Sequence, residues 1–211
     1  MSMVAIKAPY TLILWDDDMA ESPRETDDCF GTMVCWHRRY DLGDKHNYTK
    51  PKEFLTELIE SIKDMNDIAI LPLYLYDHSG ITMNTTGFSC PWDSGQVGWV
   101  YADKDKILSE FGVDQLTPEI MENAKNLLRG EVSYYDHYIR GDCYGFQLYR
   151  DDKEIDSCWG FIGDTDDLRD AIECHLPDEC KGMMNDLTYR SDDPHIETIL
   201  REHEGDFGIE P

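Results

Sequence analysis

The stretch ILPLYLYDHSG, ITMNTTGF, SCPWDSGQVGWVY, which fills residues 70–101, is the part of the chain that decides its fold. An apolar run rich in strand-forming residues ends at Asp77-His-Ser-Gly80, and a second such run extends from Val97 to Tyr101. This pattern predicts two strands joined by a polar loop that contains several glycines. Loops held by a rigid sheet can aim side chains without breaking the core, so we expect function to centre on this loop.

Segments on either side of this stretch complete the predicted fold. Helices between some strands and direct hairpins between others predict an α+β fold, built around a mixed, largely antiparallel sheet of about six strands with four or five helices. The other strands are expected at residues 10–15, 31–37, 143–149 and 155–161. Helices are expected at residues 51–65, 104–111, 118–138, 164–175 and 194–203.

No Pro-, Ser- or Gly-rich linker divides the 211 residues. We expect one α+β core domain over residues 1–163 and an acidic helical C-terminal extension over residues 164–211, packed on the core or trailing from it.

The chain has no apolar run near the roughly 20 residues that a membrane span needs, and its N-terminus lacks a basic segment followed by an apolar one. Its seven cysteines are an odd number, which favours reduced thiols over a disulfide framework. No CxxC pair is present, so the signal for a structural zinc site is weak. We therefore expect a cytoplasmic protein without a membrane partner.

The formal net charge is −25, from 44 acidic and 19 basic residues. Residues 1–100 carry 16 acids and 8 bases, whereas residues 101–211 carry 28 acids and 11 bases, so the acidity increases toward the C-terminus. Such a field repels nucleic acid and anionic membranes and attracts basic partners. Direct binding of DNA or RNA is disfavoured, because that mode relies on cationic side chains.

The central loop offers one candidate catalytic set. His78, Cys90 and Asp93 are the residue types of a thiol nucleophile with an imidazole base and an orienting acid, which meet in space rather than in sequence. Pro91 directly after the cysteine departs from the helix start at which such thiols are commonly activated. These residues would make the protein a small cytosolic hydrolase, which is the alternative to the inhibitor function that we favour below.

A metal hydrolase is a second way to use the same region, with carboxylate and imidazole ligands at strand ends. No HExxH, GxxxxGK[ST] or GxGxxG motif supports it, and we expect neither a metal nor another cofactor. Three consecutive aspartates, Asp16 to Asp18, follow the strand expected at residues 10–15, and they are more typical of a polar loop than of a cation site. The candidate ligands are Asp16, Asp18, His37, Asp77, His78 and Asp93.

A structural role for the loop is the third interpretation. Its short polar side chains would hydrogen-bond the loop backbone, with Trp92, Trp99 and Trp159 as core anchors. The compact cationic cluster, His37-Arg38-Arg39, either clamps an anion or balances neighbouring carboxylates, and we favour balancing.

Several motifs in one order give the chain a resemblance to a known family. It resembles uncharacterised accessory proteins that bacteriophages and other mobile elements carry, over roughly the first three quarters of its length. That family has no established activity, so the resemblance assigns no residue a role. It implies a small cytosolic protein expressed during infection or transfer, where blocking host nucleic-acid-binding machinery is a frequent task. The motifs are Glu21-Ser-Pro-Arg24, Gly31-Thr-Met-Val-Cys-Trp-His37, Tyr76-Asp-His-Ser-Gly80, Cys90-Pro-Trp-Asp-Ser-Gly-Gln-Val-Gly98 and Asp156-Ser-Cys-Trp-Gly-Phe161.

Charge and context together favour an acidic, DNA-mimic-like inhibitor of a basic nucleic-acid-binding host protein that acts in defence. Duplex DNA carries one charge per about 1.7 Å, so 25 charges match roughly 42 Å of duplex, about the diameter of a compact chain of this length. Mimicry requires that the carboxylates gather on one face. The candidate partner-binding residues are Asp151, Asp152, Asp164, Asp166, Asp167, Asp170, Glu173, Asp192 and Asp193.

Overall fold

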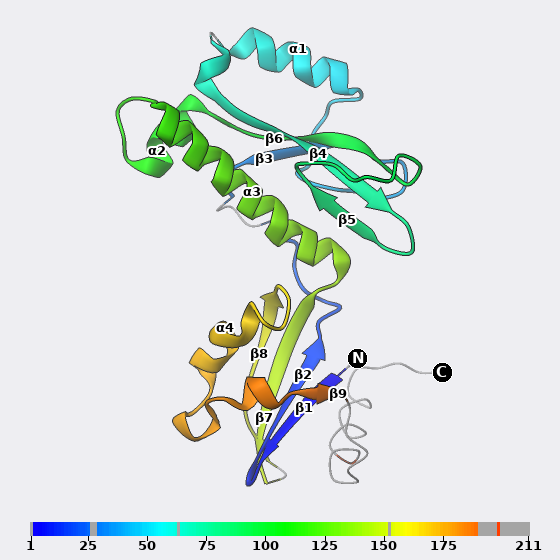
Figure 1. Ribbon diagram of the computed structural model, residues 1–211, viewed down its shortest axis with the longest axis vertical. Helices are drawn as coiled ribbons and strands as arrows, with labels where there is room; N and C mark the ends of the chain where they lie inside the picture. Colours follow the sequence, from blue (N-terminus) through cyan, green and yellow to red (C-terminus); the bar gives the residue numbers. More distant parts are fainter. Residues whose placement is uncertain (1, 26–28, 63, 152, 190–197, 199–211) are drawn as a thin grey trace. The chain divides into compact units, whose positions relative to one another are not determined.

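The computed structural model describes residues 2–25, 29–62, 64–151, 153–189 and 198 (Figure 1). The predicted helix at 194–203 and the candidate residues Asp152, Asp192 and Asp193 lie outside these ranges. The α+β class is confirmed, and the described strands form two antiparallel sheets, one of five strands and one of four. The chain packs as two units: residues 1–20 with 141–211, and residues 21–140. The expected boundary at residue 163 falls inside the first of these units.

The first unit, residues 1–20 with 141–211, is built on the five-stranded sheet, whose order is β8-β7-β2-β1-β9. Apolar side chains of β2 and β7, including Leu12 and Phe146, pack against Leu168 and Ile172 of α4. One face of the sheet is therefore covered by a helix in this unit. The elements are β1 (Ser2–Lys7), β2 (Tyr10–Asp16), β7 (Cys143–Arg150), β8 (Lys153–Ile162), α4 (Leu168–His175), two 3-10 turns, η2 (Asp178–Cys180) and η3 (Met183–Asp186), and β9 (Thr188–Tyr189).

The second unit, residues 21–140, is built on the four-stranded sheet, whose order is β3-β6-β4-β5 (Figure 1). The long helix α3 contributes Ala124, Leu128 and Val132 to a core that includes Leu73 and Val100 of the sheet. The elements are β3 (Thr32–Cys35), α1 (Pro51–Ser61), a 3-10 turn η1 (Met65–Asp67), β4 (Ile68–Asp77), β5 (Ile81–Asn84), β6 (Ser94–Asp103), α2 (Lys104–Phe111) and α3 (Pro118–Arg140).

Helix α1 uses one residue to anchor an aromatic cluster in this unit. Phe54 is 1 % exposed, and its ring centroid lies 5.5 to 6.0 Å from those of Trp36, Trp99 and Tyr101. The helix begins at Pro51, as predicted, because proline suits a first helical position that has no hydrogen bond to donate. This cluster fixes the start of the loop that follows β3.

Candidate functional site

Strands β4 and β6 display the central loop, as the sequence predicts. They are neighbouring antiparallel strands, and their ladder closes where the Asp77 N–H donates to the Asp93 carbonyl at 2.8 Å. Strand β5 interrupts the expected loop by pairing with the end of β4. The polar residues on either side of β5 are therefore held close to one another by the sheet.

The structure brings the three candidate catalytic residues together. Asp93 Oδ2 lies 3.4 Å from His78 Nδ1 and 3.7 Å from Cys90 Sγ. The carboxylate is thus the middle group and contacts both the imidazole and the thiol. In a thiol nucleophile the imidazole is the middle group, because it takes the thiol proton while the acid orients it. The three residues converge, but not in the order that nucleophilic catalysis uses.

Other side chains of this loop hydrogen-bond its backbone. The Ser94 hydroxyl donates to the Cys90 carbonyl, and the Gln96 amide donates to the Gly98 carbonyl at 3.2 Å. Asn84 accepts hydrogen bonds from the N–H groups of Thr86 and Gly87. This pattern is the one that the structural interpretation of the loop expects.

The tryptophan expectation fails at two of its three positions, because both Trp92 and Trp159 are exposed. Trp92 is 91 % exposed and is therefore not a core anchor, whereas Trp99 packs between Trp36 and Phe54. Trp159 is 39 % exposed and lies over Gly145, where an added Cβ would meet its ring at 2.1 Å. Sequence composition identifies a large apolar side chain, but its place at a loop tip decides its exposure.

The candidate metal ligands do not form one site. Asp16 and Asp18 belong to the first unit, and His37, Asp77, His78 and Asp93 to the second. Across the described residues, no group of three or more His, Cys, Asp or Glu side chains is arranged to hold a metal ion. The carboxylate between the two aspartates, that of Asp17, accepts the N–H groups of Met19 and Gly160 at 3.1 Å, as expected of a polar loop after a strand.

The cationic cluster is divided between two environments. Arg39 pairs with Asp77 and so balances a carboxylate, as the sequence analysis favours, and the same carboxylate lies 3.9 Å from His37 Nε2. Arg38 is exposed, and none of the hydrogen bonds or ion pairs found within the described ranges involves it. The ring of His37 stacks on Tyr40 with centroids 5.0 Å apart.

A pocket of about 700 Å³ opens beside this cluster. Its walls combine aromatic rings with cationic side chains, and this volume is typical of small-molecule sites. His46 lines it with Nε2 2.8 Å from the Cys35 carbonyl; because a carbonyl only accepts, Nε2 carries the proton. The lining residues include Trp36, Arg38, Tyr40, Lys45, His46 and Gln96.

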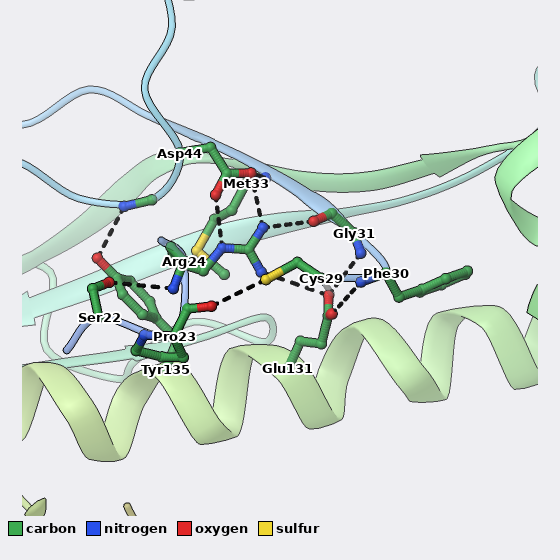
Figure 2. A network of polar contacts seen from close by, with 11 residues as sticks. Ser22, Pro23, Arg24, Cys29, Phe30, Gly31, Met33, Asp44, Glu131 and Tyr135 are labelled. Carbon is green, nitrogen blue, oxygen red and sulfur yellow. Dashed lines mark hydrogen bonds and ion pairs between the residues drawn. The ribbon is translucent and has the colours of Figure 1, made fainter. Parts of the chain in front are cut away.

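A buried network is centred on Arg24 (Figure 2), and one of its members, Asp44, also lines this pocket. The guanidinium is 4 % exposed and binds both carboxylate oxygens of Asp44, at 2.7 and 2.8 Å, together with the Gly31 carbonyl at 2.6 Å. Glu131 of α3 lies 3.7 Å from the same guanidinium and accepts the backbone N–H groups of Phe30 and Gly31.

Sequence reasoning missed this network. Arg24 belongs to one of the quoted motifs, but its partners follow 20 and 107 residues later, and no local pattern connects them. The Asp44 carboxylate also accepts the Met33 N–H at 2.8 Å, and the Tyr135 hydroxyl accepts the Gly43 N–H at 2.9 Å. The network therefore joins the loop after β3 to helix α3.

Burial changes the acidity of several groups in this network. Burial, followed by the charge of Asp44, raises the pKa of the Cys35 thiol to about 12. Burial also raises the pKa of Tyr135 to about 12. For Arg24, burial lowers the pKa, but the hydrogen bond and charge of Asp44, with Cys29 and Glu131, outweigh burial and raise it. Cys35 is thus a protonated core thiol at neutral pH.

The described candidate partner-binding residues all belong to the first unit. Asp151 lies in the β7–β8 turn, and the other members lie before or on α4. Glu173 is half-buried and accepts the Gly182 N–H at 3.0 Å; the others are exposed. Asp164 accepts the N–H groups of Asp166 and Asp167, which shapes the turn into α4.

Comparison with family models, with curated proteins and with solved structures finds no match for this chain. Among the described residues, no helix is long and apolar enough to cross a membrane.

Proposed function

We propose that the protein is an acidic inhibitor that occupies the nucleic-acid groove of a basic host protein. The observation that carries this proposal is the concentration of carboxylates in the first unit. By sequence, that unit has 23 acidic and 7 basic residues in 91 positions, whereas the second has 21 and 12 in 120. Its net charge is therefore −16, against −9 for the larger unit.

Helix α4 and the residue that precedes it expose part of this charge. Leu168 and Ile172 are buried against the sheet, whereas Asp167, the N-cap residue just before the helix, and Asp170, in its first turn, are exposed. Positions three apart on a helix rise by about 4.5 Å. Phosphates along one DNA strand rise by about 3.4 Å, so the two spacings are comparable.

These carboxylates are available to a partner. None of the hydrogen bonds or ion pairs among the described residues involves the side chains of Asp151, Asp167 or Asp170. Asp166 is paired with Arg169 at 2.7 Å, an exposed contact that contributes little and is readily exchanged. A cationic groove can therefore bind this surface without first breaking a buried ion pair.

The resemblance to accessory proteins of bacteriophages supplies the biological setting of the proposal, in which the partner is a host defence protein that binds nucleic acid. Charge complementarity raises the association rate and the specificity of such a complex, and salt weakens the electrostatic attraction between the partners.

The test is a pulldown from host lysate in low salt, followed by elution with a 20-base-pair DNA duplex. The proposal predicts that DNA releases a basic nucleic-acid-binding protein. Its affinity for the purified protein should fall about tenfold or more between 50 and 200 mM salt, because many exposed charges contribute. Removing two charges as Asp167→Asn/Asp170→Asn should weaken the complex several-fold.

The matched control is Glu110→Gln/Asp114→Asn, which removes two exposed carboxylates from the second unit. This variant should bind like the unaltered protein. If both double variants weaken the complex equally, Asp167 and Asp170 are not part of the binding surface. If DNA releases no partner, the mimicry proposal fails.

The hydrolase alternative has less support. His78, Cys90 and Asp93 do meet, but the thiol contacts the carboxylate rather than the imidazole. The inhibitor proposal predicts that His78→Gln and Cys90→Ser leave partner binding unchanged, and a turnover that either substitution abolished would favour the alternative.

A further inference from the structure

The lining of the pocket beside the loop that follows β3 holds as many lysine and arginine side chains as carboxylates, although the whole molecule is strongly acidic. Arg38 and Lys45 line it, and the carboxylate of Asp44 in its wall is already bound by Arg24 at two oxygens. Asp41 is the remaining carboxylate of the lining. Once Asp44 is paired with Arg24, the lining has two cations, Arg38 and Lys45, and one carboxylate, Asp41. The whole chain has a net charge of −25.

In the part of the chain that the structure describes, one of the two cations is unpaired and the other is held only by an exposed ion pair. Within the described ranges Arg38 has neither a hydrogen bond nor an ion pair, although its neighbour Arg39 is paired with Asp77. Lys45 lies 3.5 Å from Glu25, but the two side chains are 88 % and 64 % exposed, so solvent screens this pair. No carboxylate among the described residues competes for Arg38, and the planar fork of its guanidinium matches phosphate oxygens.

The walls of the pocket offer a second kind of contact. Trp36 and His46 are tilted rings with centroids 4.9 Å apart, and His37 is stacked on Tyr40. The Trp36 indole donates to the Tyr48 carbonyl at 3.0 Å, which fixes its orientation. Fixed aromatic walls with a few polar groups at one side are typical of sites for flat ligands.

We infer that this pocket binds a small phosphate ester that carries a flat ring, with Arg38 and Lys45 on the phosphate and Trp36 and Tyr40 beside the ring. A phosphate suits two cations because it carries up to two negative charges near neutral pH. This inference is separate from the proposed inhibition, since it concerns a small ligand and the second unit.

The test is a titration of the full chain, labelled with ¹⁵N, with AMP, adenosine and inorganic phosphate. AMP should shift amide signals of residues 35–46 and of Gln96 and Val97, and it should bind more tightly than adenosine or phosphate because it makes both kinds of contact. Arg38→Gln should weaken AMP binding about tenfold, since a hydrogen bond to a charged group is lost. Arg38 is exposed and has no partner among the described residues, so the variant should keep the fold. Amide signals of core residues at the same positions as in the unaltered protein would verify this.

The control is Arg129→Gln, which removes an exposed arginine of α3 that does not line the pocket. It should leave AMP binding unchanged. The inference is overturned if AMP shifts no signal in these segments, or if adenosine alone binds as tightly as AMP. It is also overturned if both arginine variants weaken binding equally, because then only overall charge matters.

Discussion

At the scale of single residues, Arg24 shows why a buried charge needs several partners. Removing a guanidinium from water is costly, and one carboxylate seldom compensates for it. Here two carboxylates and a carbonyl surround the group, and those carboxylates also accept backbone N–H groups of residues 30, 31 and 33. The arginine therefore neutralises charges that themselves hold the backbone in place.

Arg24→Gln should lower the free energy of unfolding of the second unit by about 3 kcal/mol, because it leaves the partly buried carboxylates of Asp44 and Glu131 without their cation. Urea denaturation followed by tryptophan fluorescence measures the change. Arg24→Lys should recover only part of the loss, since an ammonium cannot bind both oxygens in the same plane. A loss no larger than that of Arg129→Gln, expected within about 0.5 kcal/mol, would show that the network is not stabilising.

Residue types alone predict part of the candidate site. Their types and their place in the loop predict that His78, Cys90 and Asp93 meet, and in the structure they do. Their order around the carboxylate depends on side-chain directions that no sequence pattern contains. The exposure of Trp92 was mistaken for the same reason, because an apolar residue at a loop tip has no neighbours to bury it.

At the scale of elements, strong local signals predict the bounds of α2 and α3 closely, whereas the helix predicted over 51–65 ends at Ser61 and the one predicted from residue 164 begins at Leu168. Helix α2 ends at Phe111 with Gly112 in the left-handed conformation at φ 60°, and α3 passes through Gly130 as expected. The short strands β1, β5 and β9 were missed, because they contain few alternating positions and are defined by their partners. The sequence predicts one sheet, whereas the structure has two, because β2 pairs with β7, more than 120 residues later, and not with the strands of the second unit.

Strand β6 depends on a glycine where two backbones approach closely. A Cβ at Gly98 would lie 2.0 Å from the Val34 carbonyl oxygen, so β3 and β6 would have to separate. Gly98→Ala should therefore destabilise the second unit by about 2 kcal/mol or more, in the range of overpacked cores. The comparison is Gly95→Ala in the same strand, where nothing lies within 4 Å of an added Cβ. Thermal unfolding of the two variants measures the difference, and equal melting temperatures would refute the expected clash.

At the scale of the whole molecule, each unit has its own core. The buried cluster that includes Met33, Leu73 and Leu128 lies within residues 21–140, and the cluster that includes Leu12, Phe146 and Ile172 lies within the other segments. Composition did not indicate this division, because no linker marks it and the first unit combines segments that are 120 residues apart.

Residues 21–140 should fold when produced alone. Their core is contained in one continuous segment, so circular dichroism should show a cooperative thermal transition and an NMR spectrum should be well dispersed. Residues 1–20 alone should remain unfolded, because β1 and β2 then form an isolated hairpin without β7. A molten 21–140 fragment would show that its core requires the rest of the chain.

The discontinuous first unit also sets an order of events during synthesis. A ribosome adds about 5 to 20 residues per second, so β2 is complete roughly 6 to 25 seconds before its neighbour β7 is available. During this interval the nascent chain carries apolar strand residues such as Leu12 and Leu14 with one side of β2 unpaired. The intervening segment, residues 21–140, has its own core and can fold during this interval, before the last strands complete the sheet of the first unit.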